Sequence, residues 1–325
     1  MTAITYLDTR LSDKTASVEE ILGSVPELVL PPGFSDQADF GRYLHEVQGL
    51  NRIQVGDPTT IFRDAREMVT KFFAQTRIDP SDIEYLVSHD LWGNLSTDVQ
   101  LAGYIQQEFG LSDACTFSLH QGCSTALLTA GLGSRLLKPG KCLMFLTACF
   151  VPDPMKNRFM APHAMFGDGL GLMVLRDPGP FEIVDFISVC SGASSHDTVN
   201  GITPVRDIVR EIKVAVGAIR QVLHRNGLDV ADIKQLVPQS INRQVFVDMY
   251  ASALRLPQDR VFSANIPQGG HIGDVDVLRN LISYTTNADL REDDYIVLYA
   301  MGGPRGKDTS HDAVLLKYRQ KEQEN

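Results

Sequence analysis

Two segments of the chain, 150 residues apart, share one order of apolar and polar positions. Residues 78–87 read IDPSDIEYLV, and residues 228–237 read LDVADIKQLV. Each follows a stretch whose apolar residues recur at helical spacing, AREMVTKFFAQTR in the first case and AIRQVLHRNG in the second. Each ends in a short apolar run that is typical of a buried strand. The pattern therefore predicts an amphipathic helix followed by a buried strand, twice.

The similarity between the two halves extends beyond these segments. Residues 104–119 resemble residues 252–266 as a helix, a turn and a short strand, and the apolar run 141–150 resembles 294–303. Each half is therefore predicted to run strand–helix–strand–helix–strand, an alternation that favours a mainly parallel sheet covered by helices. We predict an α/β fold in which two duplicated halves stack about a pseudo-twofold axis. The predicted boundaries of the halves are 1–176 and 177–325.

Composition places the chain among ordinary globular proteins. Of its 325 residues 43% are apolar and 22% charged, and a net charge of −10 disfavours a nucleic-acid partner, which requires a basic face. The five cysteines match no disulfide framework, and no CxxC pair indicates zinc, which favours a reducing compartment. The N-terminal segment lacks a signal-peptide pattern, and no apolar run approaches the ~20 residues that span a bilayer. We expect a cytoplasmic protein with no metal and no membrane partner.

Cys123 is the first candidate for chemistry, in the segment SLHQGCSTALLTAG. The preceding strand is expected to end near Leu119, and a helix rich in Ala and Leu begins just after Cys123. The unpaired N–H groups and the dipole of a helix N-terminus favour a thiolate, and they can also bind a developing oxyanion. By position alone, Cys123 is either a nucleophile or a buried structural cysteine. The buried structural role is expected for the other four, Cys115, Cys142, Cys149 and Cys190.

His271 is the second candidate, in the segment GGHIGDVD that spans 269–276. This segment follows VFSANI, the counterpart of the strand before Cys123, so the repeat is expected to bring the two turns face to face. Asp274 and Asp276 follow closely, and a carboxylate beside an imidazole fixes its tautomer and stabilises the imidazolium. Two interpretations stay open: a histidine that activates a nucleophile, or a loop histidine beside a helix-capping aspartate.

Together these segments resemble the thiolase superfamily, and within it the ketoacyl-ACP synthase III branch, over nearly the whole chain. Cys123 matches the nucleophile of that family. MFGDGLGLMVL, 165–175, is similar to the family's FGDGAGAVVL segment, with leucines where two alanines are usual. AMGGPRG, 300–306, resembles the Gly-rich turn near the family's C-terminus. The family's VPHQAN and GNTS segments are matched by LVPQSINR, 236–243, and IPQGGHIG, 266–273.

The resemblance implies a thiolase-like fold with a layered αβαβα architecture and homodimers formed through the sheet of the first half. It also implies an acyl thioester donor, either an acyl carrier protein with its phosphopantetheine arm or CoA, and no permanently bound cofactor. The oxyanion hole is assigned by the match to the N–H groups of Cys123 and Gly303. Gln239 and Asn242 fall at substrate-binding positions of the family.

Two departures from the family bear on function. Condensing members carry a His in the HQAN segment and an Asn in the GNTS segment, which together hold a malonyl thioester while it loses CO2. This chain has Gln239 and His271 at those positions, and a glutamine cannot act as a base. GHIGDVD fits the pattern GHxGxxD, which resembles a subgroup from secondary metabolism with a Cys–His–Asp triad. By that match the triad is Cys123, His271 and Asp276, and Asp274 is the less favoured carboxylate.

These features predict an acyltransferase. Cys123 is expected to take an acyl group from a carrier-protein or CoA thioester, after which His271, oriented by Asp276, activates a small-molecule hydroxyl, amine or thiol acceptor in secondary metabolism. Two alternatives stay open. One is a synthase III-type enzyme that forms a C–C bond with release of CO2 or selects a starter unit. The other is a non-catalytic partner subunit of a ketosynthase.

Several further residues are candidates for contacts around the site. His120, His163 and His196 are candidates for residues near the pocket, and Asp168 is expected to be structural. Arg158 lies in a stretch that the family uses near the tunnel mouth, where it is a candidate to bind an acidic carrier or an acyl carboxylate. An acidic carrier needs a local basic patch on this acidic chain. The candidates for that patch are Arg42, Arg52, Arg63, Arg225, Lys234 and Arg243.

Overall fold

The fold is seen in a computed structural model that describes residues 1–25, 28–31, 33–93, 100–152, 158–160, 164–193, 205–303 and 308–320. Within these residues, nine strands form one mixed sheet in the order β11-β13-β14-β10-β1-β9-β6-β4-β5. Those of the first half are β1 (Ala3–Leu11), β4 (Ile83–Asp90), β5 (Cys115–Ser118), β6 (Cys142–Cys149) and β9 (Gly169–Arg176). Those of the second half are β10 (Phe181–Ala193), β11 (Ile233–Pro238), β13 (Tyr295–Gly302) and β14 (Asp308–Tyr318).

The two halves of the sheet repeat one pattern of strand pairing. In the first half β4 pairs in parallel with β5 and β6, while β9 pairs antiparallel with β6 and β1. In the second half β11 and β13 are parallel, and β14 is antiparallel to β13 and β10. A short antiparallel pairing between β1 and β10 joins the halves. The duplication predicted from the sequence is therefore present in the fold.

The sheet is less parallel than predicted. β9 follows β6, and β14 follows β13, with no helix described between them, so each pair turns back antiparallel instead of crossing over. The expected strand VFSANI is also shorter than predicted. In the described structure it contributes a single parallel bridge, from Val261 to Leu236 in β11.

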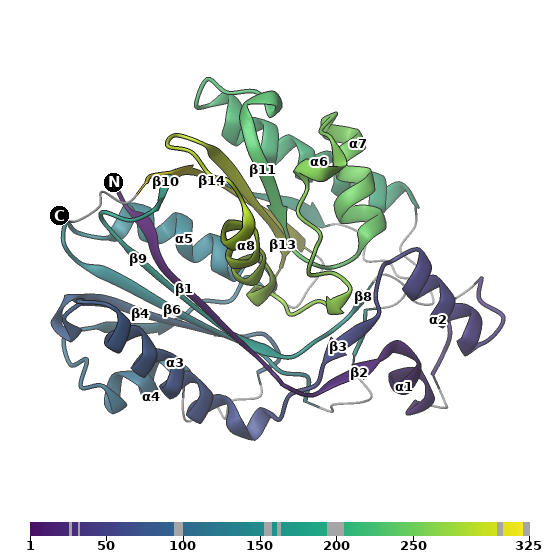
Figure 1. Ribbon diagram of the computed structural model, residues 1–325, viewed down its shortest axis with the longest axis horizontal. Coiled ribbons are helices and arrows are strands. Elements are labelled where there is room, and N and C mark those ends of the chain that lie inside the picture. Colours follow the sequence, from purple (N-terminus) through teal and green to yellow (C-terminus); the bar gives the residue numbers. More distant parts are fainter. Residues whose placement is uncertain are drawn as a thin grey trace.

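Helices cover the sheet in layers, as Figure 1 shows. α3 (Ile61–Gln75) and α4 (Leu101–Glu108) pack on the first half, and α6 (Val205–His224) and α7 (Tyr250–Leu254) pack on the second. α5 (Thr125–Leu136) and α8 (Val275–Asn287) contact strands of both halves and lie in the centre of the molecule. Ala126 and Ala130 of α5 are buried. Because these side chains are small, the helix can pack closely on two sides.

Smaller elements flank this core. α1 (Val18–Gly23) and α2 (Gln37–Glu46) lie beside the short sheet formed by β2 (Thr15–Ser17), β3 (Arg52–Gln54) and β12 (Gln268–Gly269). β7 (Phe159–Met160) and β8 (Ala164–Met165) form a separate pair. The repeated D-x-x-D sequences fold alike: Asp79 and Asp229 each cap a short 3-10 turn that leads into β4 and β11 respectively. The repeated sequence therefore forms the same kind of aspartate-capped turn in both halves.

Two expectations from composition can be compared with the fold. All five cysteines are free, and Cys142 and Cys149 are buried as predicted. Cys115 and Cys190 are exposed, so the prediction of a buried role was wrong for these two. In the part of the chain that the structure describes, no helix combines the length and the apolar character needed to cross a membrane.

Candidate active site

The Cys123 turn joins β5 to α5 at the carboxyl end of the parallel strands. Ser124 is the N-cap of α5, so Cys123 lies directly before the N-cap, near the helix N-terminus as predicted. Thr125 shapes the turn, since its hydroxyl accepts from Gln121 N at 2.9 Å and donates to Gly122 O at 2.7 Å. Cys123 is half-buried, so its thiol is packed in the site and still reachable. A helix N-terminus is thus held against a reachable thiol.

The Cys123 turn is in backbone contact with the glycine turn at the end of β13. A Cβ atom on Gly302 would lie 2.3 Å from Gln121 O, and one on Gly122, whose φ is +59°, would lie 2.5 Å from Gly303 O. Only glycine allows this approach. The N–H of Gly303 donates to Gln121 O at 2.9 Å, so a role for Gly303 in the oxyanion hole requires this bond to open or to be shared.

His271 lies in the loop between β12 and α8 and is completely buried. Its N–H donates to Met165 O at 2.7 Å, and its carbonyl accepts from Gly167 N at 2.9 Å. The ring packs against Phe166, with 5.2 Å between the ring centroids. The GDG segment of the first half therefore fixes the loop of the second half that carries His271.

Asp276, in the first turn of α8, orients the ring of His271. Its Oδ2 accepts from His271 Nδ1 at 2.6 Å and from Ser240 N at 3.0 Å, and its Oδ1 accepts from Ile272 N at 3.0 Å. Asp276 is buried, and three donors hold its carboxylate in place. Of the two aspartates that the sequence left open, Asp276 is the one that pairs with His271.

Charge around His271 favours its protonated ring. Burial by itself lowers the pKa of the ring, because a buried cation loses its hydration. The negative charges of Cys123 and Asp276, with the hydrogen bond to Asp276, outweigh burial and raise the pKa of His271 to about 10. Nε2 has no hydrogen-bond partner among the described residues. The balance favours an imidazolium at His271.

Comparisons with known proteins point to one family. Residues 223–305 match the family model 3-Oxoacyl-[acyl-carrier-protein (ACP)] synthase III C terminal. The beta-ketoacyl-[acyl-carrier-protein] synthase III of Acidiphilium cryptum strain JF-5 is 22% identical over 223 residues, which cover 61% of this chain and 67% of that protein. ChlB3, a solved structure described as an acyltransferase, has a TM-score of 0.78 at 20% identity, covering 98% of this chain and 97% of its own. The 3-oxoacyl-[acyl-carrier-protein] synthase III of Aquifex aeolicus VF5 has a TM-score of 0.77 at 18% identity, covering 98% and 100%.

The chain is similar to ketoacyl-ACP synthase III proteins, in residues 223–305 by the family model and over nearly its whole length by fold. Its thiolase-like fold, predicted from the sequence motifs, is confirmed by solved structures that match it over nearly the whole length of both chains.

The side chain of Gln239 binds the backbone around Cys123. Its Nε2 donates to Cys123 O, and its Oε1 accepts from Met301 N at 2.9 Å. The side chain is buried and joins the Cys123 turn to β13. Asn242 is buried too, and its Oδ1 accepts from Val245 N at 2.8 Å. The substrate-binding role predicted for both residues stays a prediction, and in this structure their side chains bind protein backbone.

Arg158 lies in the interior of the protein. It is fully buried, and its guanidinium donates to both carboxylate oxygens of Asp168, at 2.5 and 3.2 Å. Asp168 also accepts from Gly56 N and Val151 N, at 2.6 and 2.9 Å. The prediction that Arg158 binds an acidic carrier was therefore wrong, because its guanidinium is buried in an ion pair with Asp168. Asp168 has the structural surroundings that were expected.

The other predicted histidines have different outcomes. His163 and His196 lie outside the described residues. His120 is exposed and contacts His89, which in turn contacts Asp274. Sequence analysis missed His89, since its partner Asp274 lies 185 residues further along the chain. Within the described residues, no three or more His, Cys, Asp or Glu side chains form a group that could hold a metal ion.

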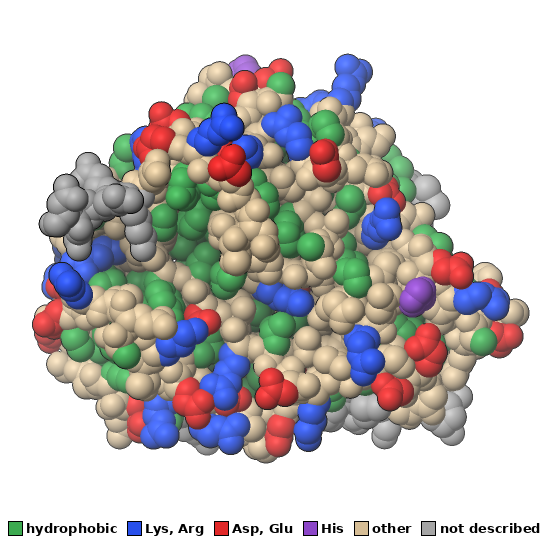
Figure 2. All heavy atoms as spheres, viewed as in Figure 1, with side chains coloured by type: hydrophobic (Ala, Val, Ile, Leu, Met, Phe, Trp, Pro, Cys, Tyr) green, Lys and Arg blue, Asp and Glu red, His purple; other side chains and the backbone are tan. Residues whose placement is uncertain are grey.

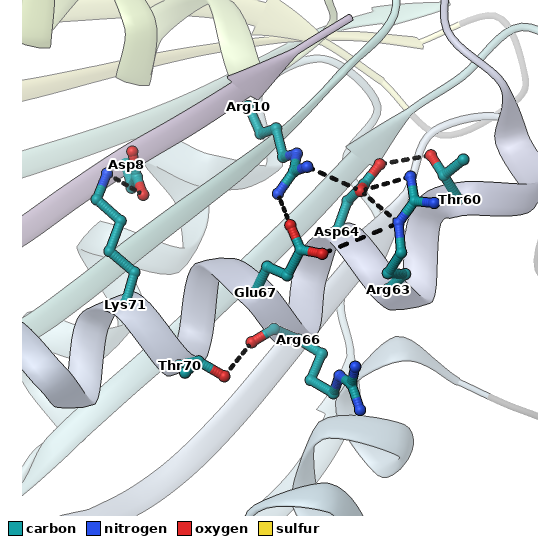
Figure 3. A network of polar contacts seen from close by, with 9 residues as sticks. All are labelled: Asp8, Arg10, Thr60, Arg63, Asp64, Arg66, Glu67, Thr70 and Lys71. Carbon is teal, nitrogen blue, oxygen red and sulfur yellow. Dashed lines mark hydrogen bonds and ion pairs between the residues drawn. The ribbon is translucent and has the colours of Figure 1, made fainter.

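Most candidates for the basic docking patch pair with acidic residues of the same chain. Arg63 contacts Asp64 at 3.1 Å, in a network that also joins Arg10 and Glu67 (Figure 3). Ion pairs also join Arg42 to Asp39, Arg225 to Asp185 and Lys234 to Asp294. Figure 2 likewise shows acidic and basic side chains interspersed on one face. These four residues therefore add little net positive charge, and Arg52 and Arg243 stay as predicted docking residues.

Proposed function

We propose that this synthase III-like protein is an acyltransferase that works through an acyl-Cys123 intermediate. The observation that carries the proposal is the state of His271. Its Nδ1 is held by Asp276 at 2.6 Å, while Nε2 has no hydrogen-bond partner among the described residues and the charge of Cys123 acts on the ring. A base in this arrangement is what the attack of a hydroxyl, amine or thiol requires.

The proposed reaction has two steps, and His271 gives up a proton in the first and takes one back in the second. The Cys123 thiolate attacks the donor thioester, the carrier thiol leaves with the Nε2 proton of His271, and Cys123 is left acylated. The acceptor then attacks the acyl carbon while Nε2 takes the acceptor's proton. Cys123 leaves as a thiolate, which restores the ion pair with His271. The Cys123 N–H supports the oxyanion in both steps, a contact worth about 3 kcal/mol in comparable sites.

Decarboxylative condensation is the second candidate, and the surroundings of Gln239 disfavour it. Condensation needs side-chain donors that hold a malonyl carbonyl while CO2 leaves. The Gln239 amide, at the position of the family's His, is engaged with Cys123 O and Met301 N. The family's Asn position is occupied by His271, whose ring is oriented by Asp276. A non-catalytic partner subunit is disfavoured because it would need neither Cys123 nor this His–Asp pair.

The proposal extends to donor, partners and setting. The donor is a phosphopantetheine thioester of a carrier protein or CoA, in line with the names of the relatives. The GHxGxxD pattern supports a role in secondary metabolism, and a free thiol fits a cytoplasmic setting. β5 is the last strand at one edge of the sheet, so it offers a pairing edge to a second copy in a homodimer.

The test separates acylation from transfer with the substitution His271→Asn, which installs the family's residue. Wild type and variant are first acylated with an acyl N-acetylcysteamine thioester, and transfer to alcohol, amine and thiol acceptors is then followed by mass spectrometry. We expect the variant to form acyl-Cys123, more slowly, and to transfer the acyl group about 10²–10⁴-fold more slowly, the usual contribution of a general base. His224→Asn, at an exposed histidine of α6, is the matched control. Unchanged transfer in His271→Asn would sink the assigned role.

A further inference from the structure

A second carboxylate–histidine pair lies beside the proposed triad. His89, at the end of β4, places Nδ1 3.0 Å from Asp274 Oδ2 and Nε2 3.0 Å from His120 Nδ1. Asp274 and His89 are buried, whereas His120 is exposed. The three side chains form one hydrogen-bonded chain that runs from the N-terminus of α8 to the turn that carries Cys123.

The side chain of Asp274 takes part in this series of hydrogen bonds and does not cap its own helix. It is the N-cap of α8, where an aspartate usually accepts a hydrogen bond from the first helical turn, yet its side chain makes no capping bond. Its Oδ1 accepts from the hydroxyl of Thr147 at 2.6 Å, and its Oδ2 faces His89. Thr147 and His89 are register partners on the parallel strands β6 and β4. Two neighbouring strand ends therefore converge on one carboxylate of the other half.

Asp274 orients the ring of His89. A carboxylate only accepts, so His89 donates from Nδ1 to Asp274 Oδ2, and this contact leaves its Nε2 facing Nδ1 of His120. Each buried group in the chain thus meets a complementary partner, and such a satisfied network holds its members in one arrangement.

This series of hydrogen bonds and the proposed triad both link the turn that carries Cys123 to the segment that leads from His271 into α8. Asp274 lies two residues before Asp276, and His120 lies three residues before Cys123. We propose that Asp274–His89–His120 is a positioning strap, which holds the Cys123 turn of the first half against the His271 loop of the second half. The inference rests on the proposed pairing of Cys123 with His271. His89 and His120 act through the turn they hold, so they are positioning residues.

Positioning matters here because the reacting groups come from different halves of the molecule. A misplacement of about 1 Å can cost roughly 10²-fold in rate, and the proposed pair of Cys123 and His271 spans the junction of the halves. The backbone bond from Gly303 to Gln121 and the amide of Gln239 hold one side of the Cys123 turn. The strap holds the residues that lead into it.

The test measures the resting ion pair, with no acyl donor or acceptor. Iodoacetamide alkylates thiolates, so the rate of Cys123 alkylation reports how well His271 stabilises the thiolate. The rate is measured from pH 6 to pH 11 by peptide mass spectrometry in wild type, His120→Ala and His89→Asn. His120→Ala removes an exposed side chain, and His89→Asn retains a donor near Asp274 while breaking the contact with His120. His224→Ala is the control variant, and the exposed Cys190 is the internal reference in every sample.

We expect both strap variants to alkylate Cys123 at least tenfold more slowly near pH 7 and to converge with wild type at high pH, where any thiol is ionised. Alkylation of Cys190 should be unchanged, and near-UV circular dichroism should show an intact fold for His120→Ala. Wild-type rates near pH 7 in both variants would overturn the strap, as would a loss that is equal at every pH. Because no acyl group is used, this result is independent of whether the protein transfers or condenses acyl groups.

Discussion

At the scale of single residues, the site depends on which side chains meet, and sequence order does not decide this. Asp274 and Asp276 both follow His271 closely, so the sequence left two carboxylates open. The first turn of α8 separates them: Asp276 reaches back to His271, while Asp274 faces His89. The motif match favoured Asp276. His89 carried no signal in the sequence, because a histidine at a strand end is recognisable only once its distant partner is placed.

The charge balance at His271 leads to a prediction about its titration. Cys123 is the largest contribution that raises the pKa of His271 to about 10, so the ring should stay protonated at neutral pH and lose its proton only as the pH rises through about 10. In Cys123→Ala the largest contribution that raises the pKa is removed while burial remains, so the pKa of His271 should fall. Nuclear magnetic resonance of labelled histidine follows this titration, with the signal assigned by its loss in His271→Asn. Cys115→Ala, at an exposed cysteine, should leave the pKa unchanged, and an unshifted pKa in Cys123→Ala would refute the ion pair.

At the scale of elements, hydrophobic periodicity predicted where helices and strands lie but not how strands pair. The repeat 78–87 and 228–237 folds twice into a capped turn and a parallel strand, as expected. The prediction of a mainly parallel sheet was wrong. Hydrophobic periodicity indicates that a segment is buried, but it carries no information on the direction of the neighbouring strand. The buried place of Arg158 was missed for a related reason, since its partner Asp168 is fixed by the fold around it.

The contact between the Cys123 turn and the β13 turn predicts a strong effect of one methyl group. In Gly302→Ala the added Cβ would lie 2.3 Å from Gln121 O and 2.6 Å from Ser124 N, both backbone atoms, so the turns must separate. We expect a loss of about 1–3 kcal/mol in the free energy of unfolding in urea, together with slower alkylation of Cys123.

The matched control is Gly103→Ala in α4, where the added Cβ meets no atom within 4 Å. An alanine inside a helix should raise the free energy of unfolding by up to about 1 kcal/mol, with Cys123 reactivity unchanged. If Gly302→Ala were as stable and as reactive as wild type, the close approach of the two turns would not exist in solution.

At the scale of the whole molecule, the site lies where two similar halves meet. Cys123 follows a strand of the first half, His271 and Asp276 lead into a helix of the second, and α5 and α8 sit together in the centre (Figure 1). The repeat and the family motifs were enough to predict the fold and to bring these turns together. The strap, the bridging role of Gln239 and the engaged N–H of Gly303 were not predictable, because each depends on angstrom-scale contacts between loops far apart in sequence.

The most direct test of acyl transfer is intact-protein mass spectrometry after mixing the protein with acetyl, malonyl, short-chain and aromatic acyl thioesters. Cys123→Ala is measured alongside as the control. The account predicts an acyl adduct that requires Cys123 and is discharged by a hydroxyl, amine or thiol acceptor, with any malonyl adduct retaining its carboxylate. A malonyl donor that loses CO2 on the enzyme, or an adduct that persists in Cys123→Ala, would contradict it.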